Sequence, residues 1–455
     1  MHASLPGCGH VMLRRCKKKP ALSGVTKNKH KMGRIAMSVE TIAAPTASLG
    51  GRWYVGATKA QWQTFWSSYL GWALDIMDLL LFAMLLSHIS AELGMDRSTA
   101  GMIASASLVA TAVGGLVFGF LADRIGRTRS MVLSILCYSI GTMLCGLSQS
   151  VTQLLLFRIV VGLGVGGEWS AGAALITETW PAHHRGKVMA WVQSAFASGY
   201  ALAALVSAIF IPLVGWRGVF FFGVAPALLA FWIRRHTPEP EIWKQQTERL
   251  SIGATVRMLF GQHGRSTLVG FAFTSAAMCG YWGLFTWIPT WLATPVANGG
   301  PGLDLVKSTT WIIVMQVGAA LGFISFGYVA DWLGRKAAFI LYFMLSALAV
   351  PFYTQMTTPT TLLIFGPIVA FVGTGFYSGF APTFAELFPT NVRATAQGFI
   401  YNSGRAVSAL APAAVGFLAT SFGLGGALAC TAGFYVLAGL IVLFFLRETK
   451  GDALQ

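Results

Sequence analysis

Long runs of apolar residues, separated by short polar segments, occupy most of the chain after residue 62. A run of about 20 apolar residues is long enough to cross a bilayer as a helix. The runs and their breaks predict two groups of six spans, divided by a polar segment at 234–265. The first group lies near 63–86, 99–121, 130–148, 152–176, 187–212 and 217–233. The second group lies near 267–293, 310–330, 337–355, 360–383, 395–420 and 426–446.

The composition agrees with a chain that lies mostly in lipid. Of the 455 residues, 55% are hydrophobic and 11% are charged, against about 25% charged residues in an ordinary soluble domain. So little polar material cannot coat a water-soluble globule of this length, which excludes a soluble enzyme. A membrane β-barrel is excluded because its strands alternate apolar and polar residues over about 10 positions. The sequence therefore predicts an all-α membrane protein.

The distribution of Lys and Arg predicts the orientation in the membrane. Short loops rich in these residues mark the cytoplasmic side. If both termini are cytoplasmic, that side carries 27 of the 32 Lys and Arg residues. The opposite side carries only Arg97, Arg217 and Lys307, while Arg158 and Arg405 fall inside spans. We therefore expect a multi-pass protein of the cell inner (plasma) membrane with both termini in the cytoplasm.

These assignments divide the chain into five segments. Residues 1–61 form a basic cytoplasmic tail that we expect to be disordered, and residues 62–233 form the first six-helix bundle. Residues 234–265 form a cytoplasmic loop, residues 266–446 the second six-helix bundle, and residues 447–455 a cytoplasmic tail.

The basic tail raises the question of its partner. A strongly basic segment is typical of nucleic-acid binding, but no zinc-finger, RNA-binding or helix-turn-helix pattern accompanies it. Anionic lipid is the partner that we expect instead. The first 36 residues lack the apolar core of a secretory signal. Met32 or Met37 is an alternative start, and a mitochondrial transit peptide is an alternative because no acidic residue precedes Glu40.

A duplication is the clearest feature of the organisation. GFLADRIGR at 119–127, after span two, returns as GYVADWLGR at 327–335, after span eight, at an offset of 208 residues. Residues after span four return after span ten at the same offset, in the pairs Glu178 and Glu386, Pro181 and Pro389, and Arg185 and Arg393. Two separate motifs with one offset predict two six-helix halves of the same orientation. In such a plan the binding site lies between the halves near the middle of the membrane.

The same motifs resemble those of the major facilitator superfamily. GFLADRIGR resembles the signature between spans two and three, RIVVGLGVGGE at 158–168 resembles the fourth-span signature, and LRETKG is similar to the ending of sugar porters. The resemblance covers the chain from about residue 53 onward. It implies a secondary transporter that works by alternating access.

A subgroup of this family shares further segments. LGWALDIMDLLLF, GEWSAGAALITETWPAHHRGK and WIRRHTPEPEIWK are most similar to bacterial sialic acid and proton symporters and their monocarboxylate-transporting relatives. Those symporters have two aspartates in span one, at the positions of Asp75 and Asp78 here. Ile76 and Met77 replace the usual glycine and aromatic residue between them, and the seventh span lacks the polar series of fungal lactate permeases. The resemblance therefore leaves the solute open.

Five ionisable residues fall inside predicted spans: Asp75, Asp78, Glu168, Arg158 and Arg405. A charge at the bilayer centre costs about 2.5–3.5 kcal/mol on insertion scales, so each one requires an explanation. Asp75 and Asp78 share one helix face, and two carboxylates this close cannot both ionise cheaply in a low dielectric. We expect them to bind a coupling proton, with Glu168 as a further candidate. The alternative is that an aspartate only pairs with an arginine.

Arg405 is the candidate anchor for a carboxylated solute, because its guanidinium offers two parallel donors to a carboxylate. The alternative is that Arg405 is a structural partner of Asp75 or Asp78. Tyr401 and Asn402 on neighbouring turns are candidates for binding hydroxyl groups of the solute. The aromatic residues that we expect to line the cavity, unless they only pack against neighbouring helices, are Trp72, Tyr281 and Trp282.

The resemblance implies gates at the cytoplasmic loop junctions. There an aspartate caps a facing helix and pairs with an arginine while the cavity opens outward. A carboxylate at a helix N-terminus is favoured by about 0.3–1 kcal/mol. Arg158 resembles a family position near the cytoplasmic end of span four, with a structural or gating role. The gating candidates are Asp123, Arg127, Arg158, Glu178, Arg185, Asp331, Arg335, Glu386 and Arg393.

No cofactor or metal is expected. GLGVGG at 162–167 matches the dinucleotide pattern formally, but it lies inside a span with no strand before it. No phosphate-binding loop of an ATP-driven pump is present, and the six cysteines and eight histidines show no metal-ligand spacing.

The sequence thus predicts proton symport of a small carboxylated solute, an acidic sugar such as sialic acid or another organic monocarboxylate. The expected partners are this solute, protons and the lipid bilayer, with no nucleic acid and no obligate protein partner. Three alternatives remain. A neutral-sugar porter fits the LRETKG ending, a drug and proton antiporter fits the aromatic lining, and a nontransporting receptor fits the fold.

Overall fold

The computed structural model describes residues 52–246, 250–303, 305–452 and 454. Most of the basic tail lies outside these residues, so its disorder and its start stay predictions. The side chains of Arg97 and Lys307 lie outside them as well. Contacts join residues Leu49–Gln455 into one compact unit, which is the unit described below.

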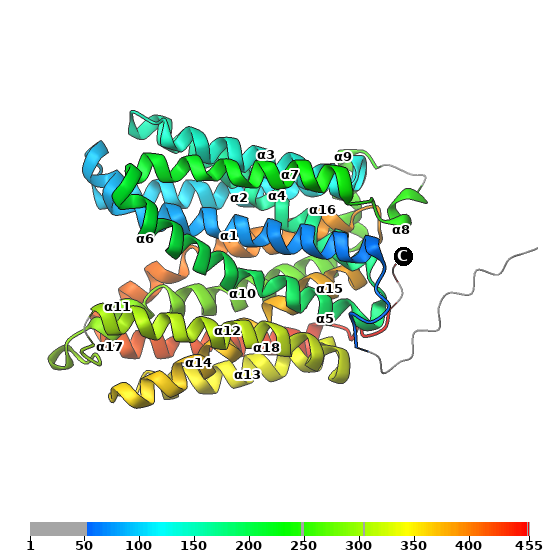
Figure 1. Ribbon diagram of the computed structural model, residues 1–455. Helices are drawn as coiled ribbons and strands as arrows, with labels where there is room; N and C mark the ends of the chain where they lie inside the picture. Colours follow the sequence, from blue (N-terminus) through cyan, green and yellow to red (C-terminus); the bar gives the residue numbers. More distant parts are fainter. Residues whose placement is uncertain (1–51, 247–249, 304, 453, 455) are drawn as a thin grey trace, which may run out of the picture. The chain divides into compact units, whose positions relative to one another are not determined.

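Helices make up the regular structure of the described chain, and those residues contain no strand. Seven helices form what we call the first half, residues 59–236 (Figure 1). They are α1 (Lys59–Leu93), α2 (Arg97–Ile125), α3 (Arg127–Gly146), α4 (Val151–Thr179), α5 (Ala182–Gln193), α6 (Ala195–Phe221) and α7 (Ala225–His236). Two short helices, α8 (Glu241–Lys244) and α9 (Ile252–Arg257), follow in the central polar segment.

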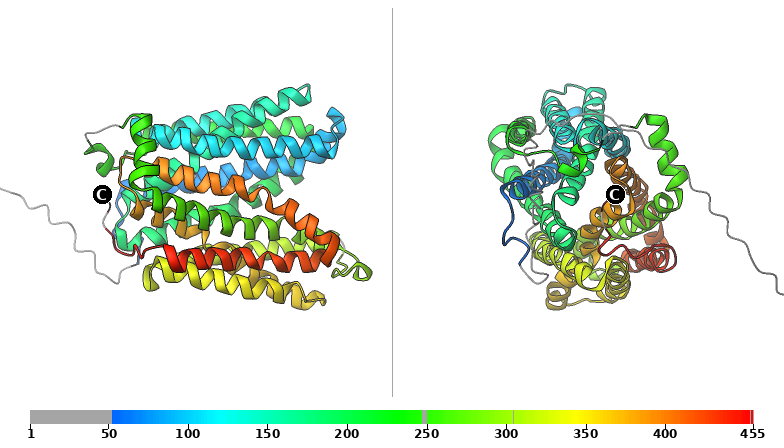
Figure 2. Two further views of the ribbon diagram at one scale, coloured as in Figure 1. Left: turned by 180° about the vertical axis from the view of Figure 1, so that it is seen from behind. Right: turned by 90° about the vertical axis from the view of Figure 1, so that its right-hand side faces the viewer.

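Nine helices form the second half, residues 264–445, beside the first (Figure 2). They are α10 (Gly264–Phe285), α11 (Ile288–Ala293), α12 (Leu305–Leu333), α13 (Arg335–Tyr353), α14 (Pro359–Gly375), α15 (Tyr377–Leu387), α16 (Arg393–Ser408), α17 (Ala411–Cys430) and α18 (Ala432–Phe445). Between the halves, α5 packs against α12 and α16 packs against α2. Because α16 repeats α5 and α12 repeats α2, these two contacts are related by the duplication.

The lengths of the helical stretches account for twelve crossings. Eleven stretches of the described chain are long and apolar enough to span a membrane, and the last, Arg393–Phe445, has 53 residues. A straight helix needs only about 20 residues to cross, so this stretch crosses twice. It turns at Gly423, whose φ of 70° only glycine adopts without strain, and Gly215 (φ 66°) makes the equivalent turn between spans five and six. The predicted all-α membrane fold with two six-span bundles is confirmed.

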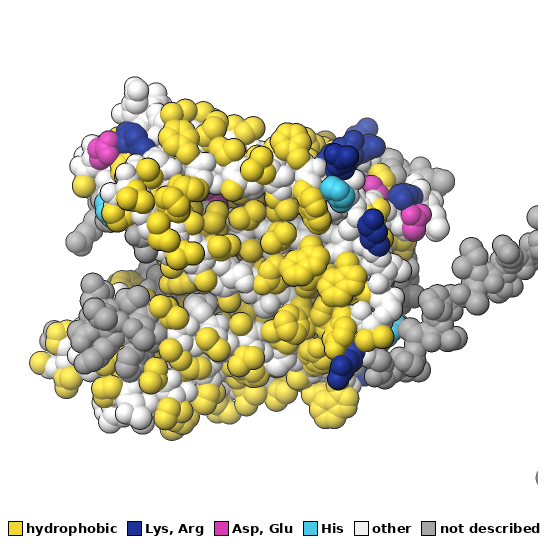
Figure 3. All heavy atoms as spheres, in the orientation of Figure 1, with side chains coloured by type: hydrophobic (Ala, Val, Ile, Leu, Met, Phe, Trp, Pro, Cys, Tyr) yellow, Lys and Arg dark blue, Asp and Glu magenta, His cyan; other side chains and the backbone are white. Residues whose placement is uncertain are grey.

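The outer surface is that of a protein embedded in lipid. Large apolar side chains such as Phe417, Trp332 and Leu213 are more than 70% exposed. Figure 3 shows hydrophobic side chains covering the middle of this face, with most of the visible Lys and Arg side chains at its right-hand side. We call this side the basic end; it carries the α2–α3 turn at Gly126, α8 and Arg447.

Several of the described spans are interrupted, and four of these breaks position the site. Span five breaks at Ser194, span seven at Thr286 and Trp287, span ten at Phe376, and span eleven at Ala409 and Leu410. Broken helices in membrane proteins free backbone groups and side chains to face a cavity at the midplane. The breaks therefore locate a cavity between the two halves.

Candidate functional site

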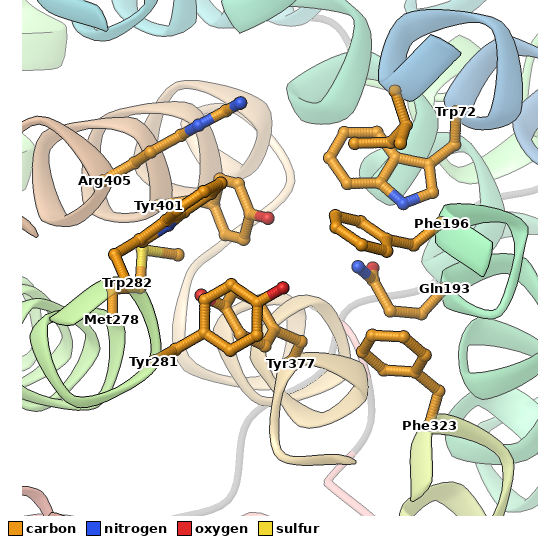
Figure 4. Close-up of a pocket in the computed structure, with 11 residues that line it drawn as sticks. Trp72, Gln193, Phe196, Met278, Tyr281, Trp282, Phe323, Tyr377, Tyr401 and Arg405 are labelled. Carbon is orange, nitrogen blue, oxygen red and sulfur yellow. The ribbon is translucent and has the colours of Figure 1, made fainter. Parts of the chain in front are cut away.

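A narrow cavity lies between the two halves at these breaks. Its lining residues come from α1, α5 and α6 of the first half and from α10, α12, α15 and α16 of the second: Trp72, Ile76, Gln193, Phe196, Met278, Tyr281, Trp282, Phe323, Tyr377, Tyr401 and Arg405. Figure 4 shows Arg405, Tyr401 and Trp282 on one side and Trp72, Phe196 and Gln193 facing them. We call this the central cavity.

The central cavity contains five of the six residues that the sequence predicted for solute binding. Trp72, Tyr281, Trp282, Tyr401 and Arg405 all line it. Arg405 is the single charged residue of the lining, and the other walls are mostly aromatic. The arrangement therefore offers one fixed positive charge at the edge of a largely apolar slot.

Asn402, the sixth predicted residue, does not line the cavity. Its Nδ2 donates hydrogen bonds to the carbonyl oxygens of Gly166 and Gly398, both at 3.1 Å. Its side chain also packs against Gly115 of α2, so it fills the contact between α2, α4 and α16. Tyr401 and Asn402 are neighbours in the sequence and point about 100° apart on the helix, which explains why only one of them reaches the cavity.

Gln193 and Tyr377 are lining residues that the sequence analysis missed. Gln193 ends α5 and Tyr377 begins α15, so each stands beside a break in its span. The repeat contains the signal that identifies them. Gln193 lies 208 residues before Tyr401, and Tyr377 lies 208 residues after Trp169, which stacks on Tyr401 with ring centroids 3.7 Å apart.

Several polar atoms of the lining have no hydrogen-bond partner among the described residues. They are Trp72 Nε1, Gln193 Oε1, Tyr377 Oη and Arg405 Nε. A buried polar group without a partner costs about 1–3 kcal/mol. The cavity thus has polar atoms available to bind a guest at both walls.

A second cavity adjoins the central one and shares Phe196, Tyr281 and Trp282 with it. The remaining lining of this outer cavity includes Leu80 of α1, Met315 of α12 and Ile288 of α11. Because α11 follows the end of α10 that is remote from Gly264, the outer cavity lies away from the basic end. Figure 3 shows a hollow between the halves on that side.

The predicted proton-binding residues lie behind the cavity wall. Asp75, Asp78 and Glu168 are at most 1% exposed, and none of them lines the central cavity. Asp75 has no hydrogen-bond partner among the described residues, and it interacts electrostatically with Arg405 and Arg158. The aspartates therefore face the interior of the first half and reach the cavity only through Arg405.

Arg158 lies apart from the other gating candidates, near the end of span four that is remote from the basic end. The α4 helix begins at Val151, on the side remote from the basic end, and Arg158 lies in its second turn. One Nη of Arg158 lies 3.7 Å from Asp78, and its guanidinium lies 4.1 Å from the ring centroid of Phe82. Arg158 is thus the counterion of Asp78.

The other eight gating candidates form two clusters at the basic end. In the first cluster Asp123 accepts hydrogen bonds from Ala394 N (3.1 Å) and Thr395 N (2.9 Å), which caps the start of α16 in the other half. Arg127 donates to Glu178 at 2.8 Å, and Arg393 of the second half donates to the same carboxylate at 2.8 Å.

The second cluster repeats the first with the halves exchanged. Asp331 accepts from Lys187 N at 3.3 Å in the first turns of α5 and pairs with Arg335 at 2.6 Å. Glu386 lies 3.2 Å from Arg335 and 3.4 Å from Arg185 of the first half. The two clusters thus join the halves at the basic end.

Close backbone contacts accompany these clusters. A Cβ atom on Gly119 would lie 2.7 Å from Ala394 O, and one on Gly327 would lie 2.6 Å from Gly186 O. No side chain fits in either position without moving the facing helix. The structure is therefore closed at the basic end.

Glu239 and Glu448 are two residues at the basic end that the sequence analysis missed. Glu239 accepts hydrogen bonds from the backbone of Arg127 (2.7 Å) at the start of α3, and Glu448 accepts from Arg335 N (2.8 Å) at the start of α13. Each carboxylate caps the helix that begins with Arg127 or Arg335. It connects that helix to the polar segment that follows its half of the chain. Their numbers differ by 209 rather than 208, so the exact offset does not reveal the pair.

The chain matches two family models. The model described as Major Facilitator Superfamily matches residues 64–306. The model described as Sugar (and other) transporter matches residues 383–455.

Proteins of similar sequence are transporters by name. The chain is 34% identical to a "Putative metabolite transport protein" of Haemophilus influenzae, with 87% of this chain and 98% of the relative covered. It is 32% identical to a "Probable 4-methylmuconolactone transporter" of Cupriavidus pinatubonensis, with 89% and 94% covered. It is 30% identical to the "Sialic acid transporter NanX" of Escherichia coli, with 86% and 96% covered.

Two solved structures share the fold. The human organic anion transporter MFSD10 matches with a TM-score of 0.69 and 15% identity, over 84% of this chain and 99% of that one. The proton:xylose symporter XylE matches with a TM-score of 0.69 and 17% identity, over 87% and 98%.

Proposed function

The chain belongs to the major facilitator superfamily, and from this premise we propose that it is a proton symporter of a small carboxylated solute. As a member of that family it is a membrane transporter and not an enzyme. The observation that carries the proposal is Arg405, the single charge in the lining of the central cavity.

Arg405 is the anchor for the carboxylate of the solute. Its guanidinium presents paired N–H donors to a planar anion, a fit that a lysine does not provide. Its Nε has no hydrogen-bond partner among the described residues, and its side chain is 5% exposed. A neutral sugar offers this buried charge no anionic partner inside the cavity, which disfavours the sugar-porter alternative.

The body of the solute lies among aromatic rings. Tyr281, Tyr377 and Tyr401 form one side of the slot, and Trp72 and Phe196 face them (Figure 4). Flat conjugated groups stack on such rings, whereas a polyhydroxylated sugar acid needs more hydrogen-bond partners than this lining has. The names of two relatives include sialic acid and 4-methylmuconolactone. Of such solutes, the lining of the central cavity favours a compact organic monocarboxylate.

Proton coupling follows from the balance of buried charge. Three acids, Asp75, Asp78 and Glu168, stand against Arg158 and Arg405. When the solute carboxylate binds Arg405, Asp75 loses much of the attraction of that arginine. The bound solute raises the number of uncompensated negative charges from one to two, and a proton on Asp75 removes the added one, so solute and proton bind together. A low-dielectric interior makes this linkage strong, because an unpaired buried charge is costly.

Alternating access uses the two clusters at the basic end. By the positive-inside rule the basic end is cytoplasmic, as are both termini, in the cell inner (plasma) membrane. Closure at that end leaves the central cavity facing the outer cavity and the outside. We infer that a proton and a solute bind from outside, that the two clusters separate, and that both are released inside. Such contacts bias the two-state equilibrium without touching the solute.

Uptake into proteoliposomes with an imposed pH gradient tests the proposal. We expect a compact aromatic monocarboxylate such as benzoate to accumulate and glucose to be excluded, with protons entering alongside the acid. Accumulation of glucose would favour the sugar porter, and expulsion of a cationic dye in exchange for protons would favour the antiporter. Absence of flux for all of these solutes in active vesicles would overturn the transporter proposal as stated.

A further inference from the structure

Two faces of α1 have different surroundings. At 100° per residue, Trp72 and Ile76 share one face, and Gly71, Asp75, Asp78 and Phe82 share another. The first face lines the central cavity. The second face, where Asp75 and Asp78 lie, is buried against α4, and Thr142 of α3 hydrogen-bonds Asp78 there.

Three carboxyl groups form a row along the buried face. A Cβ atom on Gly71 would collide with Glu168 Oε1, so the Glu168 carboxyl lies beside Gly71, one turn from Asp75. Asp78 follows three residues later, with Arg158 and Phe82 beyond it. From Gly71 to Asp78 the helix rises about 10 Å, so this carboxyl row of Glu168, Asp75 and Asp78 extends through about a third of the hydrocarbon core.

Tyr138 of α3 lies against the middle of the row. It is fully buried, its hydroxyl has no hydrogen-bond partner among the described residues, and it interacts electrostatically with Asp75, Glu168 and Asp78. Thr142, one turn further along α3, donates a hydrogen bond to Asp78 Oδ1. Since α1 and α3 run in the same direction, this bond places Tyr138 at the level of Asp75.

The second half has none of these groups at the repeated positions. An offset of 208 residues leads from Asp75, Asp78 and Glu168 to Gly283, Thr286 and Phe376. It leads from Arg158 to Gly366 and from Tyr138 to Ser346. Because the same six-span fold forms without them, the fold does not require the carboxyl row, and its cost in buried charge requires another explanation.

We propose that the carboxyl row and Tyr138 form a proton path inside the first half, separate from the path of the solute. The inference rests on the proposed function, since it assumes that protons accompany the solute. The new element is the route of these protons. They travel behind the cavity wall, and this route meets the central cavity only where Asp75 faces Arg405. Tyr138 is then the relay that passes protons along the row.

Each step moves one proton and leaves the relay unchanged. A proton from outside binds Asp78, which is held by Arg158. The transfer requires the Tyr138 hydroxyl, which makes no hydrogen bond to a described residue, to reach Asp78 and Asp75 together. It then accepts that proton on oxygen while it donates its own proton to Asp75, so the tyrosine stays neutral throughout. A second transfer from Asp75, again through Tyr138, protonates Glu168, from which the proton leaves at the basic end. Arg158, Arg405 and Cys145 are the other titratable or charged groups in electrostatic contact with Asp75 or Asp78.

Tyr138→Phe tests the relay, because it removes only the hydroxyl. Tyr353→Phe is the matched control: Tyr353 lies in α13, the repeat of α3, and its hydroxyl is also buried without a partner, but no charged group acts on it. In proteoliposomes with an enclosed pH dye, we compare proton uptake driven by benzoate with benzoate exchange at equal pH. The wild type and Tyr353→Phe should perform both. Tyr138→Phe should retain exchange and lose about 10²-fold in solute-driven proton uptake, the lower part of the range for a positioned proton-transfer group.

The outcomes separate this inference from the proposed function. If wild-type protein transports benzoate without proton uptake, the proposed coupling itself fails. If the wild type couples and Tyr138→Phe couples equally well, or loses exchange and proton uptake in parallel, the relay is refuted while proton symport stands.

Discussion

Glu178 of the first half and Arg393 of the second half meet at 2.8 Å across the boundary between the halves. Both side chains are fully buried. The repeat-related pair, Glu386 and Arg185, meets at 3.4 Å with acid and base exchanged between the halves. A buried ion pair that loses one partner costs about 3–5 kcal/mol, so these pairs are able to hold the basic end closed.

Glu178→Gln should therefore shift the protein toward a state that is open at the basic end. The loss of about 3 kcal/mol corresponds to about a 10²-fold change in the ratio of two states. Spin labels at Arg129→Cys and Ala337→Cys, which lie two residues into α3 and α13, report the opening as a longer distance. Glu241→Gln, in an exposed pair with Lys244, should change nothing. An unaltered distance distribution in Glu178→Gln would show that the pair does not hold this end closed.

Arg405→Gln should weaken the binding of carboxylates by about 10- to 100-fold, because a hydrogen bond to a charged group contributes about 1.5–3 kcal/mol. Arg405→Lys should recover only part of this, since an ammonium lacks the paired donors. Calorimetric titration of the purified protein with benzoate measures both variants. Arg129→Gln, outside the cavity, serves as control. Wild-type affinity in Arg405→Gln would remove the anchor.

Asp78→Asn should abolish accumulation driven by a pH gradient and spare solute exchange. The amide keeps the shape and the hydrogen bond from Thr142 but cannot carry the proton. Asp75→Asn should also lose gradient-driven accumulation and keep solute exchange, if Asp75 couples the proton to Arg405. Radiolabelled uptake and counterflow in the same vesicles distinguish the two activities. Full accumulation in both variants would exclude the aspartates from coupling.

Trp169→Leu should weaken solute binding by about 2- to 10-fold. Trp169 stacks on Tyr401 at 14° and 3.7 Å and so holds a wall of the central cavity, and such pairs contribute about 0.5–1.5 kcal/mol beyond burial. Titration with benzoate measures the change, with Trp66→Leu, at 45% exposure, as control. Equal affinities would mean that Tyr401 keeps its position without the stack.

Asn402→Ala should lower thermal stability and leave the dissociation constant of the solute unchanged. Its amide donates to Gly166 O in the contact between α4 and α16, and a buried carbonyl left without a donor costs about 1–3 kcal/mol. Thermal denaturation in detergent, together with benzoate titration, checks both expectations. A large loss of affinity at unchanged stability would return Asn402 to the solute site.

The sequence by itself determined the membrane fold, the two halves and much of the central cavity. Apolar runs are set by local composition, and a shared offset of 208 residues reports symmetry without any coordinates. Applied to Tyr401, a residue that the sequence predicted for the cavity, the same offset also identifies Gln193, because symmetry places equivalent residues around one axis. Tyr377 is related in this way to Trp169, whose place beside Tyr401 only the structure shows.

Only the tertiary structure decided which way each buried side chain points. The α1 helix is enclosed by protein on several faces, so no amphipathic pattern distinguishes the side of Trp72 from the side of Asp75. For the same reason the sequence did not separate Tyr401 from Asn402, or assign Arg158 to Asp78. These choices depend on the rotation and packing of neighbouring helices, which the hydrophobic pattern of a fully buried helix does not record.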